Sequence, residues 1–438
     1  MFPVLSAVSI AGDYLKTRRD RASEEGFKPS IRFLNGEVHH WYRMVLGYPD
    51  HLVASLFERL SVKRTSRVLD PFCGSGTTLV ECMKRGVASV GIDANPVAVL
   101  ASLAKTTWNL DSKRLVDMAQ QVRRRAEFAY ARNSFTADPT YRYFMKSGML
   151  KRGWISPRPL KKALAIKQSL NASRFTEKYK RILRLCLLSE VVHHASNVKF
   201  GPEIYCATKK RDTLVFEGFY ERVEEVAADL GKVGSLPHAK SSVIEGDARQ
   251  SSSLMHRRSF THCICSPPYP TEHDYTRNSR LELAFLECVT DLESLRKIKR
   301  TMIRSHTKGI YKGDRDAESA KDHEVITRLV SRLRKEVGDA VGFVGLYPDV
   351  VAHYFGGMKR HFRDLATLLV PGARCAYVVG DQSSYRGIHI PTAKILGTIL
   401  ESLNFADIQI VRWRGRWSTA RSNRVDENVL LFSMPARG

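Results

Sequence analysis

The sequence predicts a doubly wound α/β sheet that is interrupted by a basic, mainly helical insertion. Short apolar strands alternate with helical segments between residues 66 and 100, and the same alternation resumes after residue 240. Strands that alternate with helices favour a parallel sheet. Residues 101–240 instead have helical spacing throughout and an excess of Lys and Arg. We therefore expect one α/β domain built from residues 1–100 and 241–438, with an insertion over 101–240.

The spacing of apolar residues predicts the individual elements of both blocks. In the first block we expect a strand at 67–69, a glycine-rich loop at 70–76, a helix at 77–85 closed by Gly86, and a strand at 88–92 that ends on Asp93. In the second block we expect strands at 242–245, 261–265, 373–379, 406–413 and 427–432, and helices at 281–288, 349–369 and 392–403. Pro371-Gly372 should end the longest helix, because proline cannot continue one.

The chain carries a large positive charge. It has 70 Lys and Arg against 45 Asp and Glu in 438 residues, a net charge of +25. Such an excess points to a polyanion, either nucleic acid or an acidic membrane surface. Residues 101–210 hold 23 Lys and Arg against 7 Asp and Glu, a difference of +16. Interleaved aromatic residues, and basic clusters without acidic partners at i+4, favour a nucleic-acid surface over a salt-bridged helix face. The candidate contacts are Arg123, Arg124, Arg125, Lys161 and Lys162.

Composition also excludes several classes of protein. No run of 18 apolar residues occurs, so we expect no membrane-spanning helix and no membrane partner. Residues 2–11 are mildly apolar but follow no basic residue, unlike a secretory signal. The 8 Cys are sparse for this length and form no C-x-x-C pair, so we expect neither disulfides nor a metal site, and a cytoplasmic location.

The loop Asp70-Pro71-Phe72-Cys73-Gly74-Ser75-Gly76-Thr77-Thr78 has the position of a ligand-binding turn between a strand and a helix. It lacks the Lys of a mononucleotide P-loop, and Leu79 stands where a dinucleotide fingerprint has its third small residue. Asp93, at the end of the next strand, is placed to hold ribose hydroxyls. The pattern indicates a nucleoside ligand with little phosphate, which S-adenosylmethionine satisfies.

A second loop, Ser266-Pro267-Pro268-Tyr269, follows an apolar strand of the second block. Its two prolines fix an extended turn at the carboxyl end of the strand, where open α/β sheets bind ligands. The Ser266 hydroxyl and the Pro267 carbonyl are acceptors suited to an exocyclic amine, and Tyr269 offers a flat face for a base.

Together the two loops resemble those of the DNA amino-methyltransferases, which methylate N4 of cytosine or N6 of adenine with S-adenosylmethionine. The resemblance covers residues 60–100 and 241–432 and leaves the insertion unassigned. It implies a Rossmann-like methyltransferase sheet, with double-stranded DNA as partner and a cognate restriction endonuclease as a further partner in a restriction-modification setting. In that family, Ser at the first position of the second loop favours N4-cytosine over N6-adenine.

The resemblance also implies residue roles. The cofactor would be held by Asp70, Phe72, Gly74, Gly76, Thr77, Asp93 and Asp247, the last at the adenine amine of the cofactor. The target base would be held by Ser266, Pro267, Pro268 and Tyr269. Residues 38–42 would pack beside the cofactor. We expect Arg277, Arg414 and Arg416 to contact the DNA.

Two alternatives remain at this point. RNA guanine-N2 methyltransferases, including tRNA enzymes, also carry a glycine loop followed by a P-P-Y loop, although Asp is commoner there in place of Ser266. A catalytically idle nucleic-acid-binding protein can keep the same fold, but intact motifs in both loops argue against loss of activity.

Overall fold

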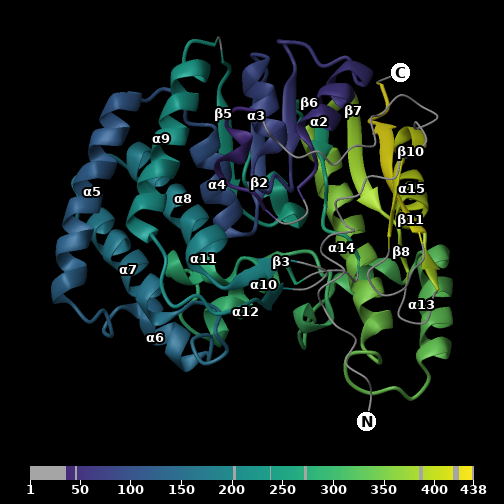
Figure 1. The fold of residues 1–438 in the computed structure, drawn as a ribbon. Coiled ribbons are helices and arrows are strands. Elements are labelled where there is room, and N and C mark those ends of the chain that lie inside the picture. The colour runs from purple at the N-terminus through teal and green to yellow at the C-terminus, as the bar shows by residue number, and fades with distance from the viewer. Residues whose placement is uncertain are drawn as a thin grey trace.

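The computed structural model describes residues 36–44, 47–200, 204–236, 238–270, 274–383, 388–417 and 424–436. Within these residues the main sheet has seven strands in the order β10-β11-β7-β6-β1-β2-β5 (Figure 1). Their bounds are β1 Arg67–Asp70, β2 Ala88–Asp93, β5 Ser241–Glu245, β6 Phe260–Cys265, β7 Leu369–Gly380, β10 Ala406–Trp417 and β11 Arg424–Ser433. The order confirms the predicted doubly wound sheet.

The strand order reverses at β1, an inner strand of the sheet between β6 and β2. The chain continues from β1 to β2 on one side and reaches β6 on the other, and all three strands are parallel. The two predicted loops follow β1 and β6, so both lie at the carboxyl ends of adjacent strands. Only at the far edge does the direction change, where β11 runs antiparallel to both β7 and β10.

Helices cover both faces of the sheet. Those outside the insertion are α2 Asp50–Arg59, α3 Thr77–Lys84, α4 Pro96–Lys105, α10 Tyr275–Asn278, α11 Arg280–Phe285, α12 Leu292–Thr301, α13 Glu324–Val337, α14 Tyr347–Leu368 and α15 Thr392–Ser402, with short turns η1 His39–Trp41, η3 Ala248–Ser253, η4 Thr307–Gly309 and η5 Asp316–Ala320. Alternate residues of each strand face opposite layers. Val68 and Ile264 pack in one core with α2, whereas Leu69 and Cys263 pack in another with α14.

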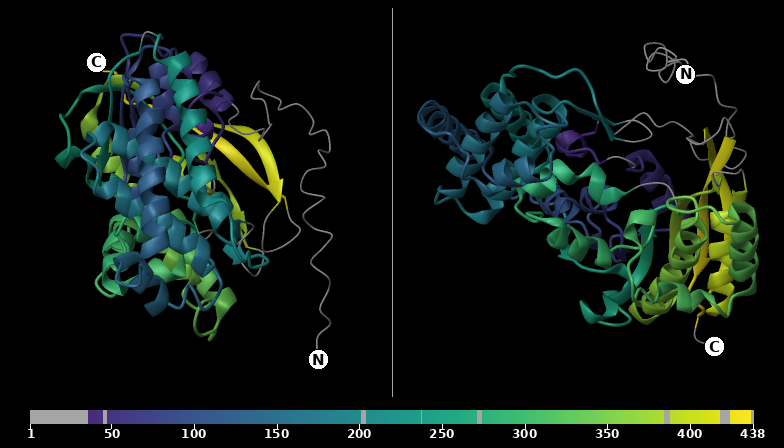
Figure 2. Two further views of the ribbon diagram at one scale, coloured as in Figure 1. Left: turned by 60° about the vertical axis from the view of Figure 1, so that its left-hand side comes forward. Right: turned by 90° about the horizontal axis from the view of Figure 1, so that it is seen from below.

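The insertion is mainly helical, as predicted. It contains α5 Ser112–Arg132, α6 Pro139–Lys146, α7 Pro157–Asn171, α8 Glu177–Glu190, the π-turn η2 Val191–Ala195, the hairpin β3 Val198–Phe200 and β4 Ile204–Cys206, and α9 Val215–Val233. The sequence boundary at residue 100 falls inside α4, so the inserted helices begin later, at Ser112. The insertion and the β10–β11 edge lie at opposite ends of the molecule (Figures 1 and 2).

The predicted end of the longest helix before Pro371-Gly372 is confirmed, because α14 ends at Leu368, but the strand expected from residue 373 begins earlier. Strand β7 begins directly after α14, at Leu369, and includes both residues. The pairing with β6 slips between Leu369 and Arg374, so the proline and glycine occupy a bulge in which proline is tolerated. Gly372 has φ of 75° there, a left-handed conformation that suits glycine.

The last hairpin is longer than the sequence predicted. The sequence predicts strands only over 406–413 and 427–432. Both strands extend further, to Trp417 and from Arg424. Cross-strand partners stabilise the extension, since the carboxylate of Glu427 binds the Arg414 side chain. A small separate hairpin joins β8 Gln382–Ser383 to β9 His389–Ile390.

In the part of the chain that the structure describes, every helix is too short or too polar to cross a bilayer.

A buried ion pair of Lys167 should stabilise the fold more than an exposed ion pair of Lys162 on the same helix. Lys167 Nζ lies 2.7 Å from Asp138 Oδ1, with both side chains buried, whereas Lys162 Nζ lies 2.8 Å from the more exposed Asp212. Lys167→Ala leaves a buried carboxylate without its cation and should lower the unfolding free energy by about 3–5 kcal/mol. Lys162→Ala should cost at most about 1 kcal/mol. Urea unfolding measures both variants, and equal losses would contradict this interpretation.

Candidate active site

The glycine loop between β1 and α3 presents bare backbone to a cavity. Gly74 and Gly76 have φ of 52° and 85°, which glycine adopts without strain. A Cβ at Gly76 would lie 2.9 Å from Ser102 Oγ, so this residue must be small to pack on α4. A Cβ at Gly74 would meet no atom within 4 Å, and Gly74 lines the cavity. The loop therefore leaves room for a ligand to approach the backbone at Gly74.

Asp70 holds the glycine loop in place from a buried position outside the cavity. It is fully buried, its Oδ1 accepts a hydrogen bond from Phe72 N at 3.1 Å, and its Oδ2 accepts one from the Tyr48 hydroxyl at 3.2 Å. Burial raises the pKa of Asp70 to about 7, although these hydrogen bonds and the nearby Thr78 hydroxyl act in the opposite direction. Asp70 does not line the cavity, so its position supports the loop rather than contacting a ligand.

Asp93 joins the end of β2 to the glycine loop. Its Oδ2 accepts a hydrogen bond from Gly74 N at 2.9 Å, and its Oδ1 accepts one from Asn95 N at 2.8 Å. Burial raises the pKa of Asp93 to about 6, and the two backbone donors limit this rise. Asn95 in turn caps α4 and donates from Nδ2 to Ser279 Oγ at 3.0 Å. Asp93 lines the cavity while holding its wall in place.

The Ser266–Tyr269 loop forms the opposite wall. The Ser266 hydroxyl donates to the carbonyl oxygen of Val378 at 3.0 Å, so its own lone pairs stay available as acceptors. Tyr269 N donates to the Tyr275 hydroxyl at 3.2 Å. Together with Pro267 and Pro268, the two residues line the cavity that the glycine loop also lines.

The ring of Tyr269 is held on several sides. Its hydroxyl donates to Glu427 Oε1 at 3.3 Å, and the Arg416 guanidinium lies 5.6 Å from the ring centre. A Cβ at Gly380 would lie 2.7 Å from the ring, so the ring packs directly on the backbone of β7. The ring is only 9% exposed. Its orientation is therefore fixed by the protein before any base could stack on it.

Most of the predicted site residues meet at this cavity. Those that line it are Phe72, Gly74, Thr77, Asp93, Ser266, Pro267, Pro268 and Tyr269. Asp247 does not line it, although its neighbours Gly246 and Ala248 do. Both carboxylate oxygens of Asp247 are occupied by Arg249, with Oδ1 at 2.8 Å from Nε and Oδ2 at 2.6 Å from Nη2. The structure thus gives Asp247 a cation partner that the sequence did not predict.

Several residues that line the cavity were missed by sequence reasoning. They are Met44, Gly47, Tyr48, Asn95, Thr301, Met302 and Ile303. They come from segments without a recognisable motif, and only the fold brings them to the cavity. The sequence did carry a signal for Glu427, because an acidic residue in an otherwise apolar strand needs a buried partner.

Residues 38–42 do not line the cavity, contrary to the expectation that they pack beside the cofactor. Instead they join three parts of the molecule. The backbone N–H of Val38 and the indole of Trp41 both donate to Asp229 of α9 at 2.8 and 2.9 Å. Lys105 of α4 donates to two backbone carbonyls of this segment, and Tyr42 donates to the buried carboxylate of Glu282 in α11.

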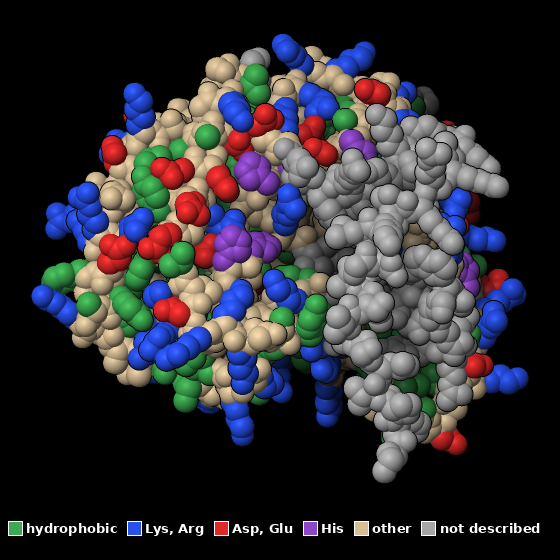
Figure 3. Space-filling view, viewed as in Figure 1, with side chains coloured by type: hydrophobic (Ala, Val, Ile, Leu, Met, Phe, Trp, Pro, Cys, Tyr) green, Lys and Arg blue, Asp and Glu red, His purple; other side chains and the backbone are tan. Residues whose placement is uncertain are grey.

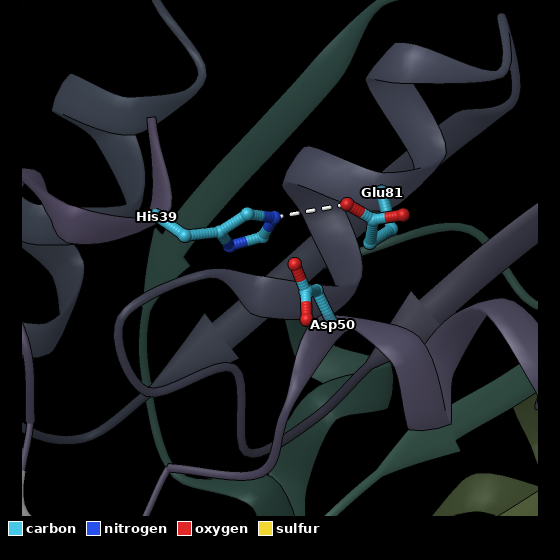
Figure 4. A group of neighbouring side chains, drawn as sticks. All are labelled: His39, Asp50 and Glu81. Carbon is cyan, nitrogen blue, oxygen red and sulfur yellow. Dashed lines mark hydrogen bonds and ion pairs between the residues drawn. The ribbon is translucent and has the colours of Figure 1, made fainter. Parts of the chain in front are cut away.

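His39, Asp50 and Glu81 lie close enough to share a metal ion (Figure 4). However, Glu81 already has cationic and hydrogen-bonding partners: His39 Nε2 at 2.9 Å from Oε1, Lys84 Nζ at 3.2 Å from Oε1, and the Arg85 guanidinium. Burial alone would raise the pKa of Glu81, but these partners lower it to about 2. The trio fits a structural ion-pair network that holds η1 on α3.

The basic residues of the insertion are partly paired, which corrects one expectation. Arg123 Nε lies 2.8 Å from Glu127 Oε1, an i,i+4 pair, and its Nη2 lies 3.3 Å from Glu217 of α9. Lys162 pairs with Asp212, and Lys161 is half-buried on the same helix. Arg124 and Arg125 are exposed. Glu127 follows Arg123 by four residues on the same helix and could be found in the sequence, whereas Glu217 and Asp212 come from distant parts of the chain.

Arg414 and Arg416 point towards the site rather than to solvent. Their side chains are 13% and 17% exposed, and both lie against the carboxylate of Glu427. Arg416 Nη2 also donates to the carbonyl oxygen of Asp381 at 3.2 Å. This position suits holding Tyr269 better than contacting phosphate. Arg277 lies half-buried in α10, close to the second loop.

Comparisons with known proteins agree with this geometry. Residues 47–104 match the family described as DNA methylase. Type II methyltransferase M.BsoBI of Geobacillus stearothermophilus is 24% identical over 433 residues, covering 87% of this chain and 81% of the relative. Type II methyltransferase M.AvaI of Nostoc sp. is 23% identical over 394 residues, covering 84% of this chain and 79% of the relative.

Shorter and more remote similarities also occur. Type II methyltransferase M.MjaII of Methanocaldococcus jannaschii is 53% identical over 38 residues, which are 9% of this chain and 7% of that protein. Among solved structures, the rRNA methyltransferase aviRa from Streptomyces viridochromogenes aligns over 90% of each chain with 11% identity and a TM-score of 0.29. Residues 47–104 are thus similar to the DNA methylase family, and most of the chain is similar to Type II methyltransferases.

Proposed function

We propose that the protein methylates the exocyclic amine of a flipped base in double-stranded DNA, and that this base is cytosine, at N4, rather than adenine, at N6. Methyl transfer and its donor, S-adenosylmethionine, follow from the family; the target atom and the residue roles are our proposal. The observation that carries it is the position of Ser266. Its hydroxyl oxygen lies at the carboxyl end of β6, in the wall of a cavity shared with the glycine loop.

The residues of the glycine loop fit S-adenosylmethionine. Gly74 leaves a gap that a side chain would fill, Phe72 adds an aromatic ring, and Asp93 ends a neighbouring strand where ribose hydroxyls are commonly held. Thr77 begins α3 at the same wall, and Gly76 and Asp70 support the loop. Asp247 lies between Gly246 and Ala248 of the cavity wall, but Arg249 donates to both of its oxygens, so an adenine amine bound there would have to share these acceptors with Arg249. When bound, S-adenosylmethionine supplies the sulfonium methyl group that the amine nitrogen takes up.

Ser266 and Pro267 would activate the amine. The lone pair of an exocyclic amine is delocalised into the ring, which makes the nitrogen a poor nucleophile. Hydrogen bonds from the amine to Ser266 Oγ and to the Pro267 carbonyl would draw the nitrogen toward sp³ geometry and expose its lone pair. Pro268 fixes the turn that aims both acceptors, so catalysis rests on positioning and electrostatics, and the surplus proton leaves to solvent.

Tyr269 would receive the base. A base inside a duplex must be flipped out, at a cost of a few kcal/mol in lost stacking. Stacking on an aromatic ring returns about 1–3 kcal/mol. Glu427 and Arg416 hold the Tyr269 ring and Arg414 supports Glu427, so we assign all three as positioning residues for this step.

We further propose that the insertion, over residues 101–240, is the region that recognises the target DNA. It carries most of the positive charge of the chain and is packed against α4 and α11 of the catalytic part. Lys161 in α7 and Arg277 in α10 are candidate phosphate contacts. The Type II relatives suggest a restriction-modification setting in the cytoplasm, with a cognate endonuclease as the second partner.

The methylated base identifies the reaction. Protein incubated with labelled S-adenosylmethionine and duplex DNA should give N4-methylcytosine when the nucleosides are separated by mass spectrometry. Ser266→Ala should lower kcat about 100-fold, because one preorganised hydrogen bond to the reacting amine is lost. The matched control is Ser259→Ala, which lies just before β6, at the other end of the same strand, and should have little effect.

Three outcomes would count against parts of this proposal. N6-methyladenine as the product would overturn the choice of cytosine. Transfer of label to tRNA but to no DNA would overturn the DNA substrate. Loss of S-adenosylmethionine binding in Ser266→Ala would show that the serine acts on the cofactor rather than on the base.

Glu427 should act on the base only through Tyr269. Tyr269→Phe keeps the ring and removes the hydroxyl, whereas Glu427→Gln keeps the shape and removes the charge. Each should lower kcat/KM for DNA about 10-fold, as expected for a lost hydrogen bond to a charged group. The double variant should lose little more than either single variant, because the two residues share one interaction. Fully additive losses would separate Glu427 from Tyr269.

A further inference from the structure

One part of the insertion lies beside the catalytic loop and is built as a single unit. It consists of residues 147–156, between α6 and α7, and of the hairpin β3–β4 with the residues that follow it to Lys210; we call it the turn–hairpin surface. Asn197 N donates to the carbonyl of Trp154 at 2.9 Å, and Asn197 Nδ2 donates to the carbonyl of Gly153 at 3.0 Å. An antiparallel bridge joins Ile155 to Ser196. The two segments therefore move as one body.

Hydrogen bonds fix this end of the insertion to the helix that follows the catalytic loop. Thr140 Oγ1 of α6 donates to the carbonyl of Ala284 in α11 at 2.8 Å, and Arg280 Nη1 lies 3.5 Å from the Tyr143 hydroxyl. Turn η2, which leads into the hairpin, also contacts α11. The hairpin accordingly lies on the same side of the molecule as α10 (Figure 1). Among the described residues, α10 is the first helix after Tyr269.

The charge of the turn–hairpin surface is almost entirely positive. No Asp or Glu occurs between residues 139 and 176. Lys151, Arg152, Lys199 and Lys209 are exposed, and within the described ranges none of them lies at ion-pair distance from a carboxylate. Tyr205, on the same hairpin, is 54% exposed. Exposed lysine and arginine beside a free aromatic ring are typical of nucleic-acid surfaces.

Like charges on this surface also perturb one another. The pKa of Lys210 is lowered, first by burial and then by the charge of Lys199. Helix α5 differs, because Arg123 is paired with Glu127 and Glu217. On the face shown in Figure 3, Lys and Arg gather along the lower margin of the insertion, whereas Asp and Glu gather above them. The unneutralised charge is thus concentrated toward the site.

We propose that the turn–hairpin surface binds the phosphate backbone of the duplex beside the flipped base. This inference rests on the proposed DNA substrate and adds the surface that holds it. Phosphates bound by Lys151, Arg152, Lys199 and Lys209 fix the duplex against α10 and α11, so that the target base is presented to the cavity between Ser266 and the glycine loop. Arg123 of α5 is instead paired with Glu127 and Glu217, and we place α5 outside this contact.

Salt dependence tests the proposal, since each phosphate contact releases counterions. We would compare Lys151→Ala/Arg152→Ala with the matched control Arg124→Ala/Arg125→Ala, which removes the same number of exposed charges from α5. The first variant should reduce the slope of log Kd against log salt concentration by about 1 to 2, and the control should leave it unchanged. Affinity for S-adenosylmethionine should stay the same in both variants.

The outcomes separate this inference from the proposed function. If the unmodified protein methylates duplex DNA but Lys151→Ala/Arg152→Ala keeps the full slope, the turn–hairpin surface is not the DNA contact. A larger loss in Arg124→Ala/Arg125→Ala would move the contact to α5 and overturn the proposal. If the unmodified protein binds and methylates only RNA, the DNA substrate itself is wrong, whatever the slopes of the variants.

Discussion

The reversal of strand order at β1 is the constraint on which the rest of the site depends. The chain passes from β1 to β2 on one side of the sheet and from β6 to β7 on the other. The loops that follow β1 and β6 therefore diverge and leave a space between them. The carboxylate of Asp93 holds one side of that space in place. Asp93, at the end of β2, accepts the backbone N–H of Gly74 and so holds the glycine loop across the strand ends. The cofactor wall and the base wall are therefore set by the sheet, and the side chains refine them.

A short segment before β1, residues 38–42, connects the catalytic part to the insertion. Val38 and Trp41 bind Asp229 of α9, while Tyr42 binds Glu282 of α11. Burial raises the pKa of Glu282 to about 7 and lowers the pKa of Lys105 to about 7, so charge on either group is costly at this junction. Buried polar groups that have hydrogen-bond partners fix how the segments pack against one another. The insertion is thereby attached to the catalytic part at two places, here and through α6.

Much of the fold could be predicted from the sequence, because the apolar period of each strand and helix is local information. The strand predictions failed where contacts between residues distant in the sequence determine the structure. A bulge opposite β6 lets Pro371 sit inside β7, and Glu427 allows an arginine-rich stretch to remain a strand. The same division holds for the site. Both loops could be found by motif, whereas Met44, Tyr48 and Met302 line the cavity from positions that no local pattern marks.

Charge was the least predictable property of the site residues. The sequence gives the sum of charges, but pairing depends on which helices become neighbours. Arg123, Arg414 and Arg416 were all expected to meet DNA, and the structure pairs each of them with a carboxylate from another element. An excess of basic residues thus indicates an anionic partner for the whole chain. It does not identify which basic residue makes the contact until the surroundings of that residue are known.

The contact between Gly380 and the Tyr269 ring also limits how this site can evolve. A Cβ at residue 380 would lie 2.7 Å from the ring, so any larger residue on β7 would displace the tyrosine. Conversely, a smaller residue at 269 would leave a hole over the backbone of residue 380. The two positions therefore form a pair matched in size between β7 and the loop after β6, and substitutions at one should be accompanied by substitutions at the other. Covariation between residues so far apart in the chain would record the shape of the base pocket in the sequences of relatives.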